Sequence, residues 1–414
     1  MSFRPSTLPS PFVYKYVGWG AHRTMAMAVI YMAFGWVLAA LALCGASYAF
    51  VSALAAGRFM RTAAPRHNFD APVTILKPLY RGEPGLRENL ESFFAQDFCA
   101  AVQIVFGVHD QDDPAISVVR DLQRKYPSFD TCIVADASLY GANAKISNLI
   151  NMLPAAKHDI LVLSDSDIRV PSNWLCQVTT ALSQPGVGLV TCLYKGAAVS
   201  KGPWPTLAAM GTSYDFLPNV VTGISLGLAE PCMGSTIALT RAMLTRIGGF
   251  NAFVDYLADD YEMGRAVRQL GLRLAIPALG VSHSATESSA TELFRHELRW
   301  NRTIRRINPV GHAGSIITFA VPLALMAAIL LDFQPLSLMV MGIALGARLF
   351  LKYRIDRIFA THAGPAWLLP IRDVLSFAVF VASLSGETVH WRGARLSVAP
   401  GGMISPSESL EAAQ

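Results

Sequence analysis

Two aspartates, Asp165 and Asp167, stand one residue apart directly after the apolar run 160–163. Such a run is typical of a strand buried on both faces, and open α/β folds bind their ligands where these strands end. Two carboxylates in a turn can hold a hard cation between the protein and a diphosphate. A solvated acidic turn is the ordinary alternative, and a short motif by itself does not decide between the two.

A second acidic pair, Asp259-Asp260, opens a stretch of helical periodicity that continues to Gly271. The helix macrodipole favours acids at an N-terminus, so capping is a sufficient reason for at least one of them. Further along the chain, arginines at i, i+4, i+7 and i+11 share one face of a single expected helix. They are Arg295, Arg299, Arg302 and Arg306. This face either meets solvent or lipid headgroups, or it clamps a diphosphate.

The elements that position these residues alternate between short apolar runs and amphipathic stretches. Strands are expected at 73–76, 103–108, 131–134, 160–163 and 187–191, and helices at 86–94, from Pro114 onward, at 145–152 and at 259–271. Repeated strand–helix–strand units predict an α/β domain with a mainly parallel sheet. Residues 238–247 are expected to form a helix that ends at Gly248-Gly249. The broken apolar segment 204–228 is either ordinary core, or lies against a bilayer, or lines an acceptor groove.

Part of the chain belongs in lipid, because 52% of its 414 residues are apolar and only 15% are charged, against about 25% charged in soluble domains. Apolar residues are dense from Met25 to Leu54, at 315–331 and at 336–351. These lengths predict an N-terminal anchor and a C-terminal membrane hairpin. A third C-terminal segment, 367–384, spans with help or lies in the interface. The arginines and lysines that follow the anchor and the hairpin favour a cytoplasmic middle domain.

These observations divide the chain into four parts: an anchor segment at 1–57, a catalytic domain at 58–310, membrane segments at 311–400 and a flexible tail at 401–414. The net charge of +5 suits an anionic membrane surface. No basic run interleaved with aromatic residues is present, so nucleic acid is not an expected partner. The six cysteines show no spacing typical of zinc sites or disulfide frameworks, which fits a reducing compartment.

Several separated motifs together resemble one family. They are residues 75–79 (ILKPL), 111–116 (QDDPAI), 143–149 (NAKISNL), 165–170 (DSDIRV), 258–261 (ADDY) and 299–300 (RW). Their order and spacing resemble the ceramide glucosyltransferase family of inverting glycosyltransferases, which includes bacterial relatives that glycosylate hopanoids. The resemblance covers about residues 70 to 310, together with the flanking membrane segments. It implies a GT-A fold, a Rossmann-like domain that binds nucleotide sugars.

The resemblance also implies a role for each matching residue. Asp110 would lie at the uridine end and Lys145 would line the nucleotide pocket, while Asp165 and Asp167 would hold the diphosphate through Mg²⁺ or Mn²⁺. Asp260 would be the general base. Arg299 and Trp300 would close over the pyrophosphate. His296 stands where the family usually has Gln or Arg, and its charge near neutral pH depends on its surroundings.

The chemistry of sugar transfer asks for these residue types independently of the resemblance. The leaving diphosphate must be neutralised, which a divalent ion and an arginine face can do. The attacking alcohol must be deprotonated, and one carboxylate, Asp260, suffices. A single base without a nucleophilic carboxylate predicts inversion at the anomeric carbon.

We therefore expect a multi-pass membrane enzyme, with its catalytic domain on the cytoplasmic side of a bacterial inner membrane. The expected donor is UDP-glucose or UDP-N-acetylglucosamine, and the expected acceptor is a lipid such as ceramide or a hopanoid. Membrane segments on both sides of the catalytic domain favour an acceptor that stays in the bilayer. Two alternatives remain open, a processive polysaccharide synthase and a membrane scaffold without catalytic activity.

Overall fold

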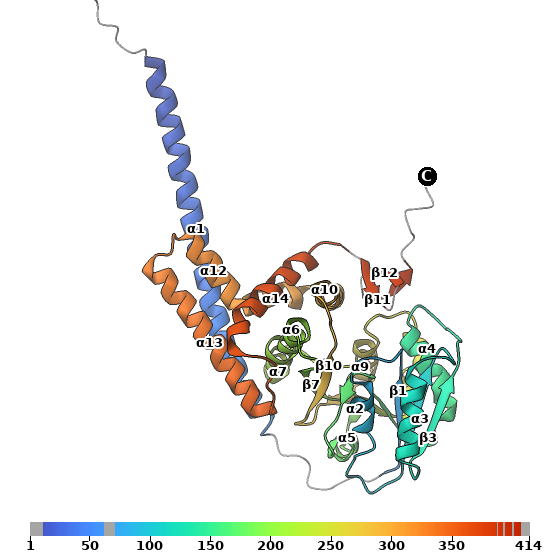
Figure 1. The fold of residues 1–414 in the computed structure, drawn as a ribbon. Coiled ribbons are helices and arrows are strands. Elements are labelled where there is room, and N and C mark those ends of the chain that lie inside the picture. Colours follow the sequence, from blue (N-terminus) through green and yellow to red (C-terminus); the bar gives the residue numbers. More distant parts are fainter. Residues whose placement is uncertain (1–10, 62–70, 387, 392–393, 400, 407–414) are drawn as a thin grey trace, which may run out of the picture. The chain divides into compact units, whose positions relative to one another are not determined.

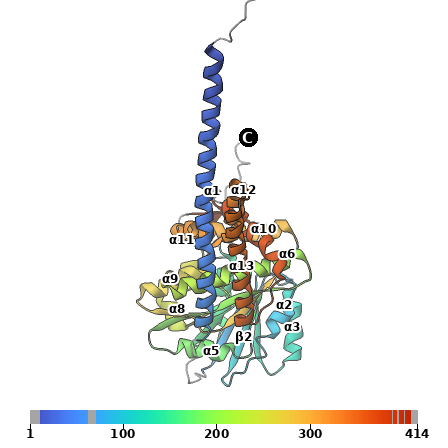
Figure 2. The same ribbon diagram turned by 90° about the vertical axis from the view of Figure 1, so that its left-hand side faces the viewer.

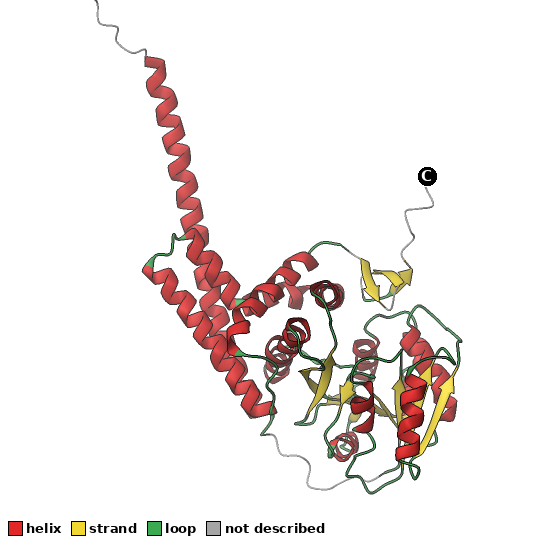
Figure 3. Cartoon of the chain, in the orientation of Figure 1, coloured by secondary structure: helices red, strands yellow, loops and turns green. Residues whose placement is uncertain are grey.

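The computed structural model describes residues 11–61, 71–386, 388–391, 394–399 and 401–406. The chain forms two compact units. The first, here called the membrane unit, combines Met1–Ala49 with Ile317–Arg348. The second, here called the catalytic unit, combines Phe50–Ile316 with Leu349–Gln414. All strands of the described chain belong to the catalytic unit (Figure 3).

Three described helices are long and apolar enough to cross a membrane: Met27–Phe59, Pro335–Phe359 and Ala366–Ser383. The first is the apolar part of α1 (Pro11–Phe59), which Figure 2 shows as one continuous coil. The second is α13, and the third joins η5 (Ala366–Leu368) to α14 (Leu369–Ser383). One candidate on the N-terminal side and two on the C-terminal side confirm the predicted arrangement.

The first limb of the predicted C-terminal hairpin is not a straight helix. The segment Pro309–Thr318 meets α12 (Ala320–Leu330) at an angle of 63°. Pro322 contributes to this bend, because it has no N–H to donate to the carbonyl of Thr318 in a continuous helix. Within the membrane unit, α1, α12 and α13 pack through small side chains, including Ala42, Ala324 and Ala344. Small residues allow helix backbones to approach closely.

The catalytic unit is built on a seven-stranded sheet with the order β3-β2-β1-β4-β8-β6-β9. Figure 1 labels β1 and β3 of this sheet. The strands are β1 (Val73–Pro78), β2 (Val102–Val108), β3 (Asp130–Ala135), β4 (Ile160–Leu163), β6 (Val187–Thr191), β8 (Ile237–Thr240) and β9 (Arg273–Ala275). The strands β3, β2, β1 and β4 are parallel, and β8 is antiparallel to both of its neighbours. Every residue of β1 and of β4 is buried, as expected for strands covered on both faces.

Helices cover both faces of this sheet and form two separate cores. One core contains apolar residues of α2 (Leu86–Glu91), α3 (Ala115–Lys125) and α5 (Trp174–Leu182). The other contains residues of α4 (Ala144–Met152), α8 (Arg241–Arg246) and α9 (Asp259–Gln269). The predicted α/β class is confirmed.

A second sheet, β5-β10-β7, consists of β5 (Ile168–Arg169), β10 (Gly280–Ala285) and β7 (Leu193–Ala198). Against it pack α6 (Pro203–Gly211), the π-helix η2 (Thr212–Phe216) and α7 (Leu217–Ser225). Most residues of this helical segment are buried. The apolar segment 204–228 is therefore largely ordinary core, and only its end exposes apolar side chains, at Leu226 and Leu228.

Two local predictions are wrong. Residues 238–247 do not form one helix, because residues up to Thr240 pair as β8 between β4 and β6, and α8 begins only at Arg241. The Thr240 side chain caps α8 by accepting a hydrogen bond from Met243 N. The tail is not flexible from residue 401, since β13 (Ile404–Pro406) pairs with β12 (Ala394–Val398), which pairs with β11 (Thr388–Trp391). Residues 407–414 lie outside the described part of the chain.

Candidate active site

The candidate site begins at the carboxyl edge of the parallel strands. Asp165 follows β4 and Asp110 follows β2, with β1 between the two strands. The carboxyl ends of parallel strands meet at one edge of the sheet, so Asp110 and Asp165 lie at the same edge. Asp110 is exposed, and its Oδ1 accepts a hydrogen bond from Asp112 N at 2.9 Å. Their places after two strands at one edge suit contacts with two ends of one extended ligand.

The turn that carries Asp165 and Asp167 is held firmly by its backbone. Asp165 O accepts a hydrogen bond from Ile168 N and another from the buried ammonium of Lys77. Asp167 O accepts from Ser284 N at 2.8 Å. These contacts come from β1 and from β10, so both sheets position the acidic turn.

Asp165, Lys145 and Asp260 converge on one point of the structure. Lys145 Nζ lies 2.8 Å from Asp165 Oδ1 and 3.4 Å from Asp259 Oδ2. Asp260 Oδ2 accepts a hydrogen bond from Gly234 N at 2.7 Å. A Cβ atom on Gly234 would lie 3.1 Å from Asp165 Oδ2, 3.3 Å from Lys145 Nζ and 3.4 Å from Asp260 Oδ2. The carboxylates that are far apart in the sequence thus surround a single glycine.

Asn143 explains why Lys145 and the Asp259-Asp260 pair meet. Its side chain caps α4 by accepting from Ile146 N. The same side chain donates to Tyr256 O at 2.7 Å and to Asp259 Oδ1 at 3.2 Å. The N-termini of α4 and α9 are therefore tied together, and both helices direct their positive ends toward the acidic cluster.

The charged groups of the cluster shift one another's pKa values. Burial and then the neighbouring Asp259 charge raise the pKa of Asp260 to about 6. Burial also raises the pKa of Asp165, although Lys145 opposes this shift. Burial alone would lower the pKa of Lys145, but the surrounding carboxylates raise it, so this side chain stays charged. A carboxyl group with a pKa near 6 is suited to accept a proton close to neutral pH.

Asp167 belongs to a neighbouring group of residues. Its Oδ2 lies 3.2 Å from His283 Nε2. Burial would raise the pKa of Asp167, but His283 outweighs it and the pKa falls to about 2. The His283 ring lies 6.0 Å from the Trp300 ring, and the Trp300 ring lies 4.7 Å from that of His296, centroid to centroid. His296 Nδ1 in turn pairs with Glu287. His283 thus links Asp167 to Trp300 and His296.

The arginines of α10 (Ala290–Ile307) contact different parts of the structure. They do lie on a single helix, as predicted. The charge of Arg299 opposes the rise that burial causes in the pKa of Tyr194, so Arg299 is near this residue. The Tyr194 ring lies 5.5 Å from the His283 ring, centroid to centroid, which puts Arg299 on the side of the site that holds His283. Arg302 instead donates to Thr388 O in β11 at 2.6 Å. At least Arg302 therefore binds the C-terminal strands and does not take part in the predicted diphosphate clamp.

The sequence profile described as "Glycosyl transferase family 21" matches residues 36–404. The chain belongs to glycosyl transferase family 21. This confirms the resemblance found in the sequence, and it makes the protein a sugar-transferring enzyme by family.

Named relatives of this family 21 chain include two ceramide glucosyltransferases. Ceramide glucosyltransferase 1 of Caenorhabditis elegans is 27% identical over 372 residues, which cover 82% of this chain and 74% of the relative. Ceramide glucosyltransferase of Candida albicans is 37% identical over 114 residues, which cover 25% of this chain and 21% of the relative.

Solved structures similar to the family 21 chain are more distant. A mannosyltransferase of Pyrobaculum calidifontis, in complex with GDP-Man and Mn²⁺, has a TM-score of 0.49 at 20% identity and covers 84% of this chain and 99% of its own. TarS of S. aureus, in complex with UDP-GlcNAc, has a TM-score of 0.36 at 13% identity and covers 80% and 98%.

The acidic turn of this family 21 chain supplies two carboxylates, Asp165 and Asp167, of the kind that bind a divalent cation. In the described part of the chain, no group of three or more His, Cys, Asp or Glu side chains is arranged as a complete metal site. Asp165, Asp259 and Asp260 nevertheless share one lysine, which leaves the cluster negative. Asp167 Oδ1 is buried and has no hydrogen-bond partner among the described residues. These residues fit an ion of the Mg²⁺ type, which is commonly bound by one or two carboxylates and by substrate phosphates.

Sequence reasoning missed four residues of this site. Asp259 received no role of its own from the sequence, which offered capping as a reason for at least one acid of the Asp259-Asp260 pair, although Asp259 pairs with Lys145. Gly234 and His283 carried no signal in a single sequence. Lys77 could have been found, because a lysine inside an apolar strand must have partners when buried. Its Nζ lies 4.0 Å from the centre of the Phe93 ring, and burial lowers its pKa to about 7.

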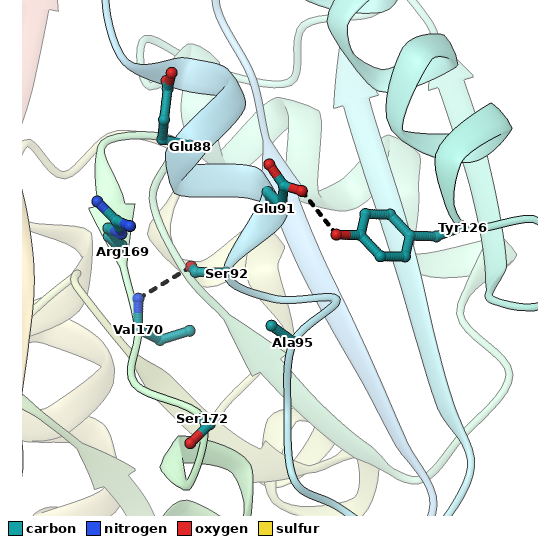
Figure 4. Close-up of a pocket in the computed structure, with 8 residues that line it drawn as sticks. All are labelled: Glu88, Glu91, Ser92, Ala95, Tyr126, Arg169, Val170 and Ser172. Atoms are coloured by element: carbon teal, nitrogen blue, oxygen red, sulfur yellow. Dashed lines mark hydrogen bonds between the residues drawn. The ribbon is translucent and has the colours of Figure 1, made fainter.

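A cavity of about 380 Å³ lies elsewhere on the catalytic unit (Figure 4). It is lined by Glu88, Glu91, Ser92, Ala95, Tyr126, Arg169, Val170 and Ser172. Glu91 accepts a hydrogen bond from Tyr126 Oη at 2.7 Å. No predicted site residue lines this cavity, so it is separate from the acidic cluster.

Proposed function

We propose that this family 21 protein transfers a hexose, glucose or N-acetylglucosamine, from a UDP-sugar to a hydroxyl group of a membrane lipid. The observation that carries the proposal is the convergence of Asp165, Lys145 and Asp260 around Gly234. The names of its relatives favour ceramide as the acceptor. A hopanoid is the alternative lipid acceptor.

In this proposal Asp260 is the general base. It takes the proton of the acceptor hydroxyl as the acceptor oxygen bonds to the anomeric carbon. The bond between that carbon and the diphosphate oxygen breaks, and UDP leaves with the bonding electrons. Burial and the Asp259 charge, which raise the pKa of Asp260 to about 6, suit this role. A single displacement by one base inverts the anomeric configuration.

The remaining residues hold the donor and stabilise its leaving group. Asp110 would contact the uridine end. Lys145, Arg299 and Trp300 would face the diphosphate, with His296 supporting the Trp300 ring. Asp165 and Asp167 would hold a divalent cation, which neutralises phosphate charge when it is bound. Fixed charges in a site that excludes water stabilise the developing charge without reorganisation.

The test is transfer by the purified full-length protein in liposomes. UDP-glucose and UDP-N-acetylglucosamine are each offered with ceramide, with a hopanoid polyol or with a soluble sugar, and products are identified by mass spectrometry. We expect one sugar per lipid, with the anomeric configuration inverted relative to the donor. Equal transfer to soluble sugars would contradict the lipid acceptor, and long glycan products would indicate a polysaccharide synthase instead.

We further propose that the catalytic unit faces the cytoplasm, in a bacterium on the inner membrane. The support is the basic residues at the end of α13, namely Arg348, Lys352, Arg354 and Arg357. Labelling of an exposed cysteine in this unit, Cys99, with a membrane-impermeant maleimide tests the sidedness. Labelling only in inside-out vesicles is expected, and labelling in intact spheroplasts would contradict the proposal.

A further inference from the structure

The helical segment formed by η5 and α14 has two unlike faces. Its exposed apolar side chains are 44% to 70% exposed, and their spacing of three, four and seven residues places them in one stripe. This outer stripe consists of Trp367, Ile371, Val374, Val381 and Leu384. The segment from 366 to 384 contains two charged residues, Arg372 and Asp373, and both are buried on the opposite face.

The inner face of α14 is fastened to the catalytic unit by polar contacts. Arg372 Nη1 lies 2.7 Å from Glu297 Oε1 in α10. Arg372 Nε lies 3.4 Å from Asp215 Oδ2 in η2, and Ser376 Oγ donates to the same oxygen at 2.7 Å. Near the other end, Ser383 Oγ lies 3.0 Å from His312 Nε2 in α11 (Pro309–Gly314). These contacts hold α14 against α10, η2 and α11, and Figure 1 shows α14 next to α10, which is viewed nearly along its axis.

These partners are incompatible with a membrane-spanning α14. A spanning α14 would carry its neighbour α10 into the hydrocarbon region, and α10 holds Arg295, Arg299, Arg302, Arg305 and Arg306. Charged side chains in that region are costly unless they face a bundle interior or a water-filled cavity.

The apolar stripe begins at Trp367, shortly after the candidate span α13 ends at Phe359. Within the catalytic unit, Tyr214 Oη donates to Asp356 Oδ1 at 2.6 Å, and Lys195 Nζ donates to Phe359 O at 2.6 Å. The end of α13 is thereby attached to η2 and β7. The residues 360–365 then connect it to η5, so the occupant nearest to the outer stripe is the bilayer itself.

We infer that α14 lies in the plane of the membrane, with the outer stripe inserted at the boundary between headgroups and acyl chains. Interfacial helices insert one apolar face at this depth. Here the other face of α14 packs on protein, through buried Leu369, Val379 and Phe380 as well as through the polar contacts. The ion pair between Arg372 and Glu297 then places α10, with Arg299 and Trp300, at the membrane surface. The inference concerns membrane geometry, and it does not depend on which sugar or lipid the enzyme uses.

Spin-label depth measurements on the full chain in phosphatidylcholine–phosphatidylglycerol liposomes test this inference. Single cysteines replace Trp367, Ile371, Val374, Val381 and Leu384 in turn, in a background whose six native cysteines are replaced. Depth follows from the ratio of collision with oxygen to collision with a nickel chelate. We expect all five labels within about 5 Å of one depth, about 5 to 10 Å below the phosphates.

A steady change of depth by about 25 Å from position 367 to 384 would show a spanning helix and overturn the inference. Contact of all five labels with the nickel chelate would show a helix on water, which would overturn it as well. The matched control is Leu139→Cys, since Leu139 is an exposed apolar residue in the loop after β3. Its label should contact the nickel chelate, and because all labelled positions are exposed, folding should not change.

Discussion

Replacing Asp260 with Asn tests whether its carboxylate is catalytic or structural. Burial and the Asp259 charge raise the pKa of Asp260 from 3.8 to about 6 in the folded protein. A raised carboxyl pKa means that the group stabilises the fold at low pH and that this contribution is lost as the pH rises through 6. At pH 7.5 the ionised group therefore opposes folding by up to about 3 kcal/mol, since each pKa unit corresponds to about 1.36 kcal/mol.

An asparagine removes this charge but keeps one oxygen that can accept the hydrogen bond from Gly234 N. We therefore expect Asp260→Asn to stabilise the protein at pH 7.5 by about 1 to 3 kcal/mol, a change of several degrees in the unfolding temperature. The gain should vanish below pH 4. Thermal unfolding in detergent at several pH values measures it.

The same substitution should abolish turnover. Loss of general-base assistance is worth about 10²- to 10⁴-fold in kcat/KM, while UDP binding, measured by calorimetry, should persist. In the unchanged enzyme, kcat/KM should rise about tenfold per pH unit up to about pH 6 and then level off, because Asp260 must be ionised to act.

The matched control is Glu262→Gln. Glu262 is also buried in the first turn of α9, but it pairs with Arg265 at 2.6 Å and stands outside the cluster. Its replacement should leave turnover unchanged. An Asp260→Asn variant that is as active as the original, or that unfolds at a lower temperature at pH 7.5, would refute the assignment of Asp260 as a base whose charged form is destabilised by burial.

Further predictions concern the charges around it. Lys145→Met leaves Asp165 and Asp259 without their cation, and should cost about 3–5 kcal/mol of stability together with activity. Lys157→Met, which breaks only an exposed pair, is its control and should change neither. Chelation by EDTA should stop transfer, and Mg²⁺ or Mn²⁺ should restore it; activity that survives exhaustive chelation contradicts a metal held by Asp165 and Asp167. Arg302→Met should lower the unfolding temperature by releasing Thr388, with little change in the KM for UDP-sugar; a large rise in that KM would return Arg302 to the diphosphate clamp.

Local patterns were enough to predict much of the scaffold. The strands 160–163 and 187–191 were predicted with the bounds that β4 and β6 have. The helix from Asp259 and the single helix carrying the four arginines were predicted as well. These elements follow from apolar runs, helical spacing and acidic helix starts, which a few consecutive residues contain.

Pairing between distant segments could not be predicted in this way. Residues up to Thr240 form a strand because they pair with β4 on one side and with β6 on the other. This pairing overrides their local helical pattern. The β11–β13 sheet and the attachment of Arg302 to it depend in the same manner on contacts across the fold.

The sequence by itself determined the α/β class, the membrane helices and the family, because periodicity, length and motif order are properties of the chain alone. Only the tertiary structure decided which charges meet. It placed Lys145 between Asp165 and Asp259, brought Asp260 to Gly234 and joined Asp167 to His283. The reason is physical: a buried charge must find its partner in space, and the folded backbone sets which side chains are close enough to be that partner.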